Sequence, residues 1–202
     1  MNRIIFTTLA LFVAINLWAQ SDDSPASIKR HQLLFSPIYL FDATFLLSYE
    51  HLFQNQTALR ITPSITLSNT DNSVFHSNLK SREGFAIDAG YKVFLFEKPR
   101  RNANVYMGPY VMYKYVKHTR GTWYSSIPDD PDIVDIYKVW GVGIDTGIKF
   151  IMGRFVMDIT VGGGVRYPLL NDDANVPAAE GILDIGYKGI APRINFCLGV
   201  TL

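Results

Sequence analysis

Apolar and polar side chains alternate along this chain in about eight segments, a pattern that predicts β-strands and not helices. The clearest segment is 154–167. Strand side chains alternate between two faces with period 2, so this segment presents an apolar face and a polar one. The apolar face holds Phe155, Met157, Ile159, Val161, Val165 and Tyr167; the polar face holds Asp158, Thr160, Gly162, Gly164 and Arg166. A strand of this length with an apolar outside and a polar inside is typical of a transmembrane β-barrel.

Eight strands are expected over 31–40, 43–53, 57–67, 84–96, 104–117, 136–151, 154–167 and 190–202. The connections after the second, fourth and sixth strands are short. Those after the third, fifth and seventh are long and rich in Asn, Asp, Ser, Pro and Gly. Outer-membrane barrels show this alternation, with short turns on the periplasmic side and longer loops outside. The prediction is therefore an all-β protein, an eight-stranded antiparallel up-and-down transmembrane β-barrel.

The expected strands also separate charged from apolar residues. No charged residue occurs in the outward set, which includes Phe45, Ile61, Ile87, Ile144 and Ile194. Four acids and six bases occupy the inward positions: Glu50, Arg60, Asp88, Lys92, Lys114, Asp145, Lys149, Asp158, Arg166 and Arg193. A Lys or Arg facing lipid at the midplane costs about 2–4 kcal/mol, so this segregation favours lipid outside and disfavours a soluble barrel of reversed polarity.

An eight-stranded barrel has an interior just wide enough for its own side chains. The ten inward charges could form an ion or proton path, or they could pair with one another. We favour mutual pairing because unpaired buried charges are costly, and we therefore do not expect a porin-like channel.

The first 20 residues have the pattern of a secretory signal peptide. Arg3 precedes an apolar run over 4–17, which ends just before Ala19 and Gln20. A membrane-anchor helix is the alternative, but Asn16 interrupts a run that is already too short. We predict a signal peptide over 1–19 and one outer-membrane barrel domain over 20–202.

Charge and cysteine content narrow the remaining classes. The formal net charge of +1 gives no electrostatic reason to expect nucleic-acid binding. Cys197 is the single cysteine, which excludes an intramolecular disulfide, and we expect it to be a small packed residue.

Two segments resemble strands of known barrels. Val105-Tyr106-Met107-Gly108-Pro109-Tyr110 resembles a Tyr-x-Gly-Pro-Tyr strand of uncharacterised outer-membrane barrels, and Leu46-Leu47-Ser48-Tyr49-Glu50 resembles their second strand. The strand layout is similar to that of the small outer-membrane families of the OmpA and OmpX type. This resemblance implies an eight-stranded barrel surrounded by the lipids of a Gram-negative outer membrane and inserted by the outer-membrane assembly machinery.

Candidate chemical sites are weak in comparison. A calcium site at Asp129, Asp130, Asp132 and Asp135 lacks the spacing of an EF-hand, and a solvated acidic turn is preferred. The histidines His31, His51, His76 and His118 lack metal-ligand spacing, so we expect no metal and no cofactor. A lipid-modifying enzyme could combine His76 with Ser73 or Ser77, or His118 with Ser125 or Ser126. No fixed triad order or nucleophile elbow supports it.

The long loops are the expected location of specific function, because rigid scaffolds often present binding residues on loops. Trp123 and Tyr124 could contact a surface protein, a glycan or the lipid headgroup layer, and the headgroup layer is preferred. The leading hypothesis is a non-enzymatic outer-membrane barrel with an envelope-structural or surface-interaction role. The alternatives are a lipid-modifying barrel enzyme and a soluble periplasmic binding protein.

Overall fold

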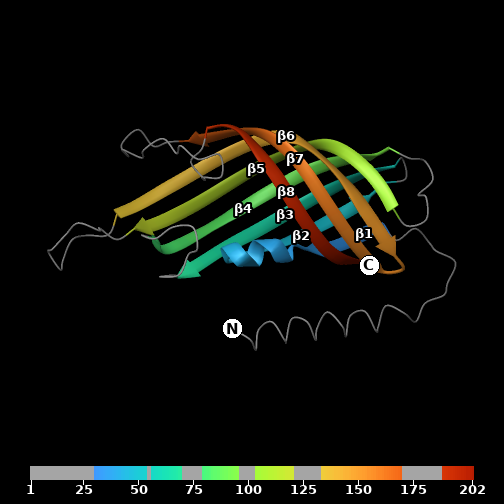
Figure 1. The fold of residues 1–202 in the computed structure, drawn as a ribbon, viewed down its shortest axis with the longest axis horizontal. Coiled ribbons are helices and arrows are strands. Elements are labelled where there is room, and N and C mark those ends of the chain that lie inside the picture. The colour runs from blue at the N-terminus through green and yellow to red at the C-terminus, as the bar shows by residue number, and fades with distance from the viewer. Residues whose placement is uncertain (1–29, 54–55, 70–78, 96–102, 121–132, 170–187) are drawn as a thin grey trace, which may run out of the picture.

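The computed structural model describes residues 30–53, 56–69, 79–95, 103–120, 133–169 and 188–202. These residues form one closed barrel of eight antiparallel strands in the order β1 to β8, with β1 pairing to β8 (Figure 1). The strands are β1 (His31–Phe35), β2 (Thr44–Leu52), β3 (Thr57–Asn69), β4 (Leu79–Phe94), β5 (Ala103–Arg120), β6 (Ile133–Met152), β7 (Phe155–Leu169) and β8 (Gly189–Thr201). The predicted fold class, an eight-stranded antiparallel up-and-down β-barrel, is confirmed.

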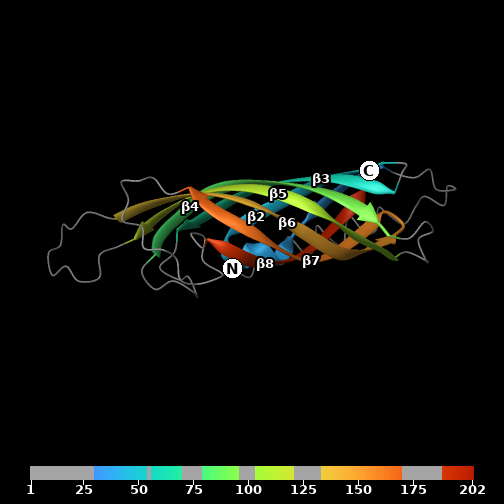
Figure 2. The same ribbon diagram turned by 90° about the horizontal axis from the view of Figure 1, so that it is seen from above.

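The strands are inclined to the barrel axis, as barrel closure requires, and both side views show this inclination (Figure 2). We call the end that carries the connections after β3, β5 and β7 the loop end. The opposite end, with the connections 53–56, 95–102 and 153–154, is the turn end. Strands β3 to β8 each exceed the 9–11 residues needed to cross a bilayer, and the longest of them, β4 to β7, extend toward the loop end.

The first predicted strand was too long. The segment 31–40 was expected to be extended throughout, but β1 ends at Phe35 and a 3-10 helix, η1, covers Pro37–Asp42. Pro37 occupies the first turn of this helix, where its missing N–H costs nothing. Ala43 then ends the helix in a left-handed conformation with φ 49°. The helix packs against β2 and β8, and thus replaces a simple turn at the loop end.

Strands β4, β5 and β6 extend furthest beyond their predicted limits. β4 begins at Leu79, five residues before the expected start. β6 begins at Ile133 and β5 runs to Arg120, so Asp135 and His118 lie within strands and not in the loop that was predicted to contain them. The two residues face each other as register partners. Within the described residues, no helix is long and apolar enough to cross a membrane.

Glycines on β6 make room for large side chains of β5. A Cβ added to Gly147 would lie 2.5 Å from the hydroxyl of Tyr106, and one added to Gly143 would lie 2.7 Å from the ring of Tyr110. Glycine within a strand lets a small closed barrel bend sharply. The structure shows a second reason, because the interior fills by setting large residues opposite small ones.

Candidate functional site

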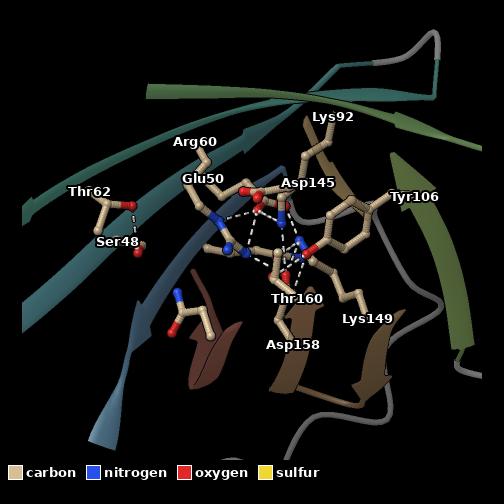
Figure 3. Close-up of polar contacts among 12 residues, drawn as sticks. Ser48, Glu50, Arg60, Thr62, Lys92, Tyr106, Asp145, Lys149, Asp158 and Thr160 are labelled. Carbon is tan, nitrogen blue, oxygen red and sulfur yellow. Dashed lines mark hydrogen bonds and ion pairs between the residues drawn. The ribbon is translucent and has the colours of Figure 1, made fainter. Parts of the chain in front are cut away.

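The interior at the turn end holds a buried cluster of charges, which we call the turn-end network. It consists of Glu50, Arg60, Lys92, Lys149 and Asp158, each at most 5% exposed. The strands β2, β3, β4, β6 and β7 supply one residue each, because each residue faces inward at the corresponding level (Figure 3).

The two carboxylates are shared among the three bases. Arg60 donates from Nε to Glu50 Oε2 at 2.9 Å and from Nη2 to Asp158. Lys92 Nζ lies 2.9 Å from Glu50 Oε2 and 2.8 Å from Asp158 Oδ2. Lys149 pairs with Glu50 and lies 3.8 Å from Asp158 Oδ2. Each acid therefore contacts all three bases, and each buried charge has a partner of opposite sign, as burial requires.

Neutral groups complete this network. Tyr106 donates its hydroxyl to Asp158 Oδ1 at 2.6 Å and lies 2.6 Å from Thr160 Oγ1. The Tyr106 ring also faces the ammonium of Lys92, with 3.9 Å between Nζ and the ring centroid. Lys149 donates to the side-chain oxygen of Gln32 at 2.9 Å. A solid plug of ionic and aromatic side chains thus fills this level of the barrel.

A second group lies nearer the loop end. Arg193 on β8 donates to Asp88 on β4 at 2.5 Å and lies 3.7 Å from Asp145 on β6. Its guanidinium carbon is 4.5 Å from the ring centroid of Tyr110. These three charged side chains are only 15–16% exposed, so the second group narrows the interior above the first.

The two remaining charges that were predicted to face inward belong to neither of these groups. Lys114 and Arg166 are half-buried, and neither forms an ion pair within the described part of the chain. The structure instead pairs Arg82 with Asp42 of η1 through two hydrogen bonds of 2.6 and 2.7 Å. Sequence reasoning missed this pair because Asp42 was placed in a turn and Arg82 in a loop.

Two residues of the candidate catalytic and calcium groups, His118 and Asp135, lie within the described part of the chain. His118 packs against Tyr137 inside the loop end, with 5.2 Å between ring centroids. Asp135 is 7% exposed and cannot be part of a solvated acidic turn. The other candidate residues, together with the predicted signal peptide, lie outside the described residues: Ser73, His76, Ser77, Trp123, Tyr124, Ser125, Ser126, Asp129, Asp130 and Asp132.

The comparisons with known proteins leave the family open. No family model and no curated protein matches the chain. Among solved structures, the chain is similar to the crystal structure of Neisserial surface protein A (NspA), at 8% sequence identity and a TM-score of 0.47. That match covers 86% of this chain and 95% of the other. The barrel assignment itself rests on the strand pairing described above.

Proposed function

We propose that this protein is an integral outer-membrane β-barrel with a closed interior, which acts without catalysis as an envelope or surface-interaction scaffold through its long loops. The outer face carries the proposal. Large apolar side chains are exposed on every strand from β2 to β8, among them Phe45, Ile65, Phe85, Val111, Val142, Ile144, Val161 and Ile194. A continuous apolar surface of this extent is foreign to soluble monomers and suits contact with lipid chains.

The position of outer charges supports a membrane boundary. Within the described strands, the outer face carries three charged residues, Glu83, Lys117 and Lys138, and all of them lie near the loop end. Just below them, aromatic rings form a continuous group across β4, β5 and β6. Phe85 lies 5.5 Å from Tyr115, and Tyr113 lies 4.9 Å from Trp140, measured between ring centroids. Aromatic belts of this kind mark the level of lipid headgroups.

The interior supports a scaffold more than a channel. Two successive groups of paired charges narrow the interior, and the turn-end network is almost fully buried. Substrate passage would have to break these pairs, at a cost of several kcal/mol for each charge left alone. The specific role therefore falls to the loops, with outer-membrane lipids around the barrel and a surface protein or glycan as the proposed partner. The resemblance to families of the OmpA and OmpX type is part of this proposal.

Membrane fractionation combined with a gel shift tests the proposal. The protein should fractionate with outer membranes, and unheated samples should migrate differently from boiled samples because a closed barrel resists detergent. Recovery in the soluble periplasmic fraction without detergent would favour the binding-protein alternative instead. Turnover of lipid A or phospholipid by the purified protein, lost in His76→Ala or His118→Ala, would favour the enzyme.

Orientation is tested by cysteine labelling in a Cys197→Ser background, which removes the buried native thiol. A membrane-impermeant maleimide should label a cysteine placed at Ser126 in intact cells. A cysteine placed at Asn55 should stay unlabelled until the outer membrane is opened. The reverse pattern would mean that the loop end faces the periplasm.

A further inference from the structure

Two histidines meet on the outside of the barrel at its turn end. His31 on β1 and His51 on β2 are register partners. The backbone hydrogen bond from Leu52 N to Arg30 O, 2.7 Å long, identifies the neighbouring position as a hydrogen-bonded pair. Pairs alternate along an antiparallel ladder, so His31 and His51 form a non-hydrogen-bonded pair, the kind in which side chains approach most closely. Their Nδ1 atoms are 3.3 Å apart.

A third polar atom joins this pair. The hydroxyl of Tyr49 lies 2.6 Å from Nδ1 of His31. A ring nitrogen carries either one hydrogen or one lone pair in the plane of the ring. His31 Nδ1 therefore has a single bonding direction but two close neighbours, Tyr49 Oη and His51 Nδ1. Hydrogen bonding alone leaves one of these contacts poorly satisfied.

A metal ion would resolve this conflict. Zinc binds histidine nitrogen at about 2.0–2.1 Å in tetrahedral geometry, which places two ligand nitrogens about 3.3–3.4 Å apart. The observed separation of 3.3 Å between the two Nδ1 atoms fits that requirement with little movement of either ring. Imidazole is also the ligand preferred by Zn²⁺ and Cu²⁺ among the common protein side chains without sulfur.

We propose that His31 and His51 form a binding site for one divalent transition metal ion of this class, with Zn²⁺ as the reference ion. Both Nδ1 atoms ligate the metal, and the Tyr49 hydroxyl binds a metal-bound water. No group of three or more His, Cys, Asp and Glu side chains gathers as a metal site within the described residues, so water fills the remaining positions. His31 is exposed, which gives the ion and its waters direct access.

The position of the pair gives the site a structural consequence. β1 is the shortest strand, with five residues, and it closes the barrel between β2 and β8. A metal ion held by one histidine from each strand would fix β1 against β2. Binding to the folded state alone then stabilises the barrel by mass action.

Zinc titration of the purified protein tests the site. For this titration the protein is produced without a polyhistidine tag and folded in detergent micelles. Zinc binding is then measured by calorimetry. We expect one Zn²⁺ per chain and a higher unfolding temperature when Zn²⁺ is present. His31→Ala and His51→Ala should each weaken Zn²⁺ binding by about tenfold or more, since each variant leaves a single imidazole. Either substitution should also abolish the rise in unfolding temperature that Zn²⁺ causes. His76→Ala, which removes one histidine but keeps the pair, should behave like the unmodified protein.

The gel shift between unheated and boiled samples verifies that each variant has folded. If His51→Ala fails this check, His51→Phe replaces it, because an aromatic ring can still pack against Phe53, whose ring centroid lies 4.8 Å from that of His51. The proposal is wrong if the folded protein binds no Zn²⁺ at about millimolar concentration. It is also wrong if only one of the two histidines matters, or if His76→Ala weakens binding as much as either does.

Discussion

Asp158→Ala should be one of the most destabilising single changes in this barrel. Its carboxylate accepts hydrogen bonds from Arg60, from Lys92 at 2.8 Å, and from Tyr106 at 2.6 Å. The turn-end network contains three bases and two acids, so its formal charge of +1 becomes +2 when Asp158 is removed. Asp158 is 0% exposed, so water does not compensate for the loss.

Two effects set the loss in the free energy of unfolding that Asp158→Ala should cause. Removing one carboxylate leaves three buried bases to share Glu50, and removing one partner from a buried ion-pair group costs about 3–5 kcal/mol. The lost hydrogen bond of Tyr106 would add about 1 kcal/mol, but the Tyr106 hydroxyl keeps a neighbour in Thr160 at 2.6 Å, which reduces this loss. We therefore expect a loss of about 4 kcal/mol in the free energy of unfolding, or about a thousandfold in the folding equilibrium.

The assay is reversible urea unfolding in lipid vesicles, monitored by tryptophan fluorescence. Glu83→Ala is the matched control because Glu83 is an exposed carboxylate on β4, and such a residue contributes about 0–1 kcal/mol. In the double variant Asp158→Ala/Lys92→Ala, two bases and one acid remain, and the formal charge returns to +1. The double variant should be more stable than the sum of the single effects predicts, by about 0.5–3 kcal/mol. Strict additivity, or an Asp158→Ala effect no larger than that of Glu83→Ala, would refute the reasoning.

Three further predictions concern the lipid face, the packing of the interior and conduction. Ile159 is 40% exposed on the outer face, so Ile159→Arg should destabilise the inserted barrel by about 2–4 kcal/mol. Ser64 points inward, and Ser64→Arg should cost less in the same unfolding assay. Equal effects would contradict the assignment of these residues to the outer and inner faces. Gly147→Ala should cost about 1–3 kcal/mol, because its Cβ would collide with the backbone carbonyl oxygen of Ile159 and lie 2.5 Å from the Tyr106 hydroxyl. Gly163→Ala, whose Cβ meets only a carbonyl oxygen at 3.6 Å, should be near neutral. Planar-bilayer recordings of the purified protein should show no stable large conductance, and reproducible porin-sized steps would disprove the closed interior.

Periodicity predicted the strands and their faces because barrel strands must present one side to the outside and one side to the interior. It failed at 31–40 for a specific reason. Ile38 and Leu40 continue the alternation begun by Leu34, but Pro37 starts a 3-10 turn that ends the strand. A proline after a short strand was a usable signal for that turn.

The partners of the inward charges were beyond the reach of sequence reasoning. Arg60 and Asp158 are 98 residues apart and lie on strands that do not pair, β3 and β7. Their contact depends on the diameter of the closed barrel and on the stagger of its strands, neither of which follows from a local pattern. The pair His31 and His51 is different, because it belongs to one hairpin. Its register would have revealed the pair if the end of β1 had been placed correctly.

The packing of the interior explains why functional signals in this chain are so few. Tyr106 and Tyr110 extend from β5 across to β6, where Gly143 and Gly147 leave room for them, and the paired charges fill the space beside the rings. In the turn-end network and around Arg193, the paired charges satisfy one another, so these groups, which could look like a transport path or a catalytic site, already have partners inside the protein. Residues still able to bind something else must then lie outside the network. On the described surface the histidine pair meets that condition, because it lies on the outer face at the turn end, away from the paired charges, and its shared nitrogen contacts are not all satisfied within the protein.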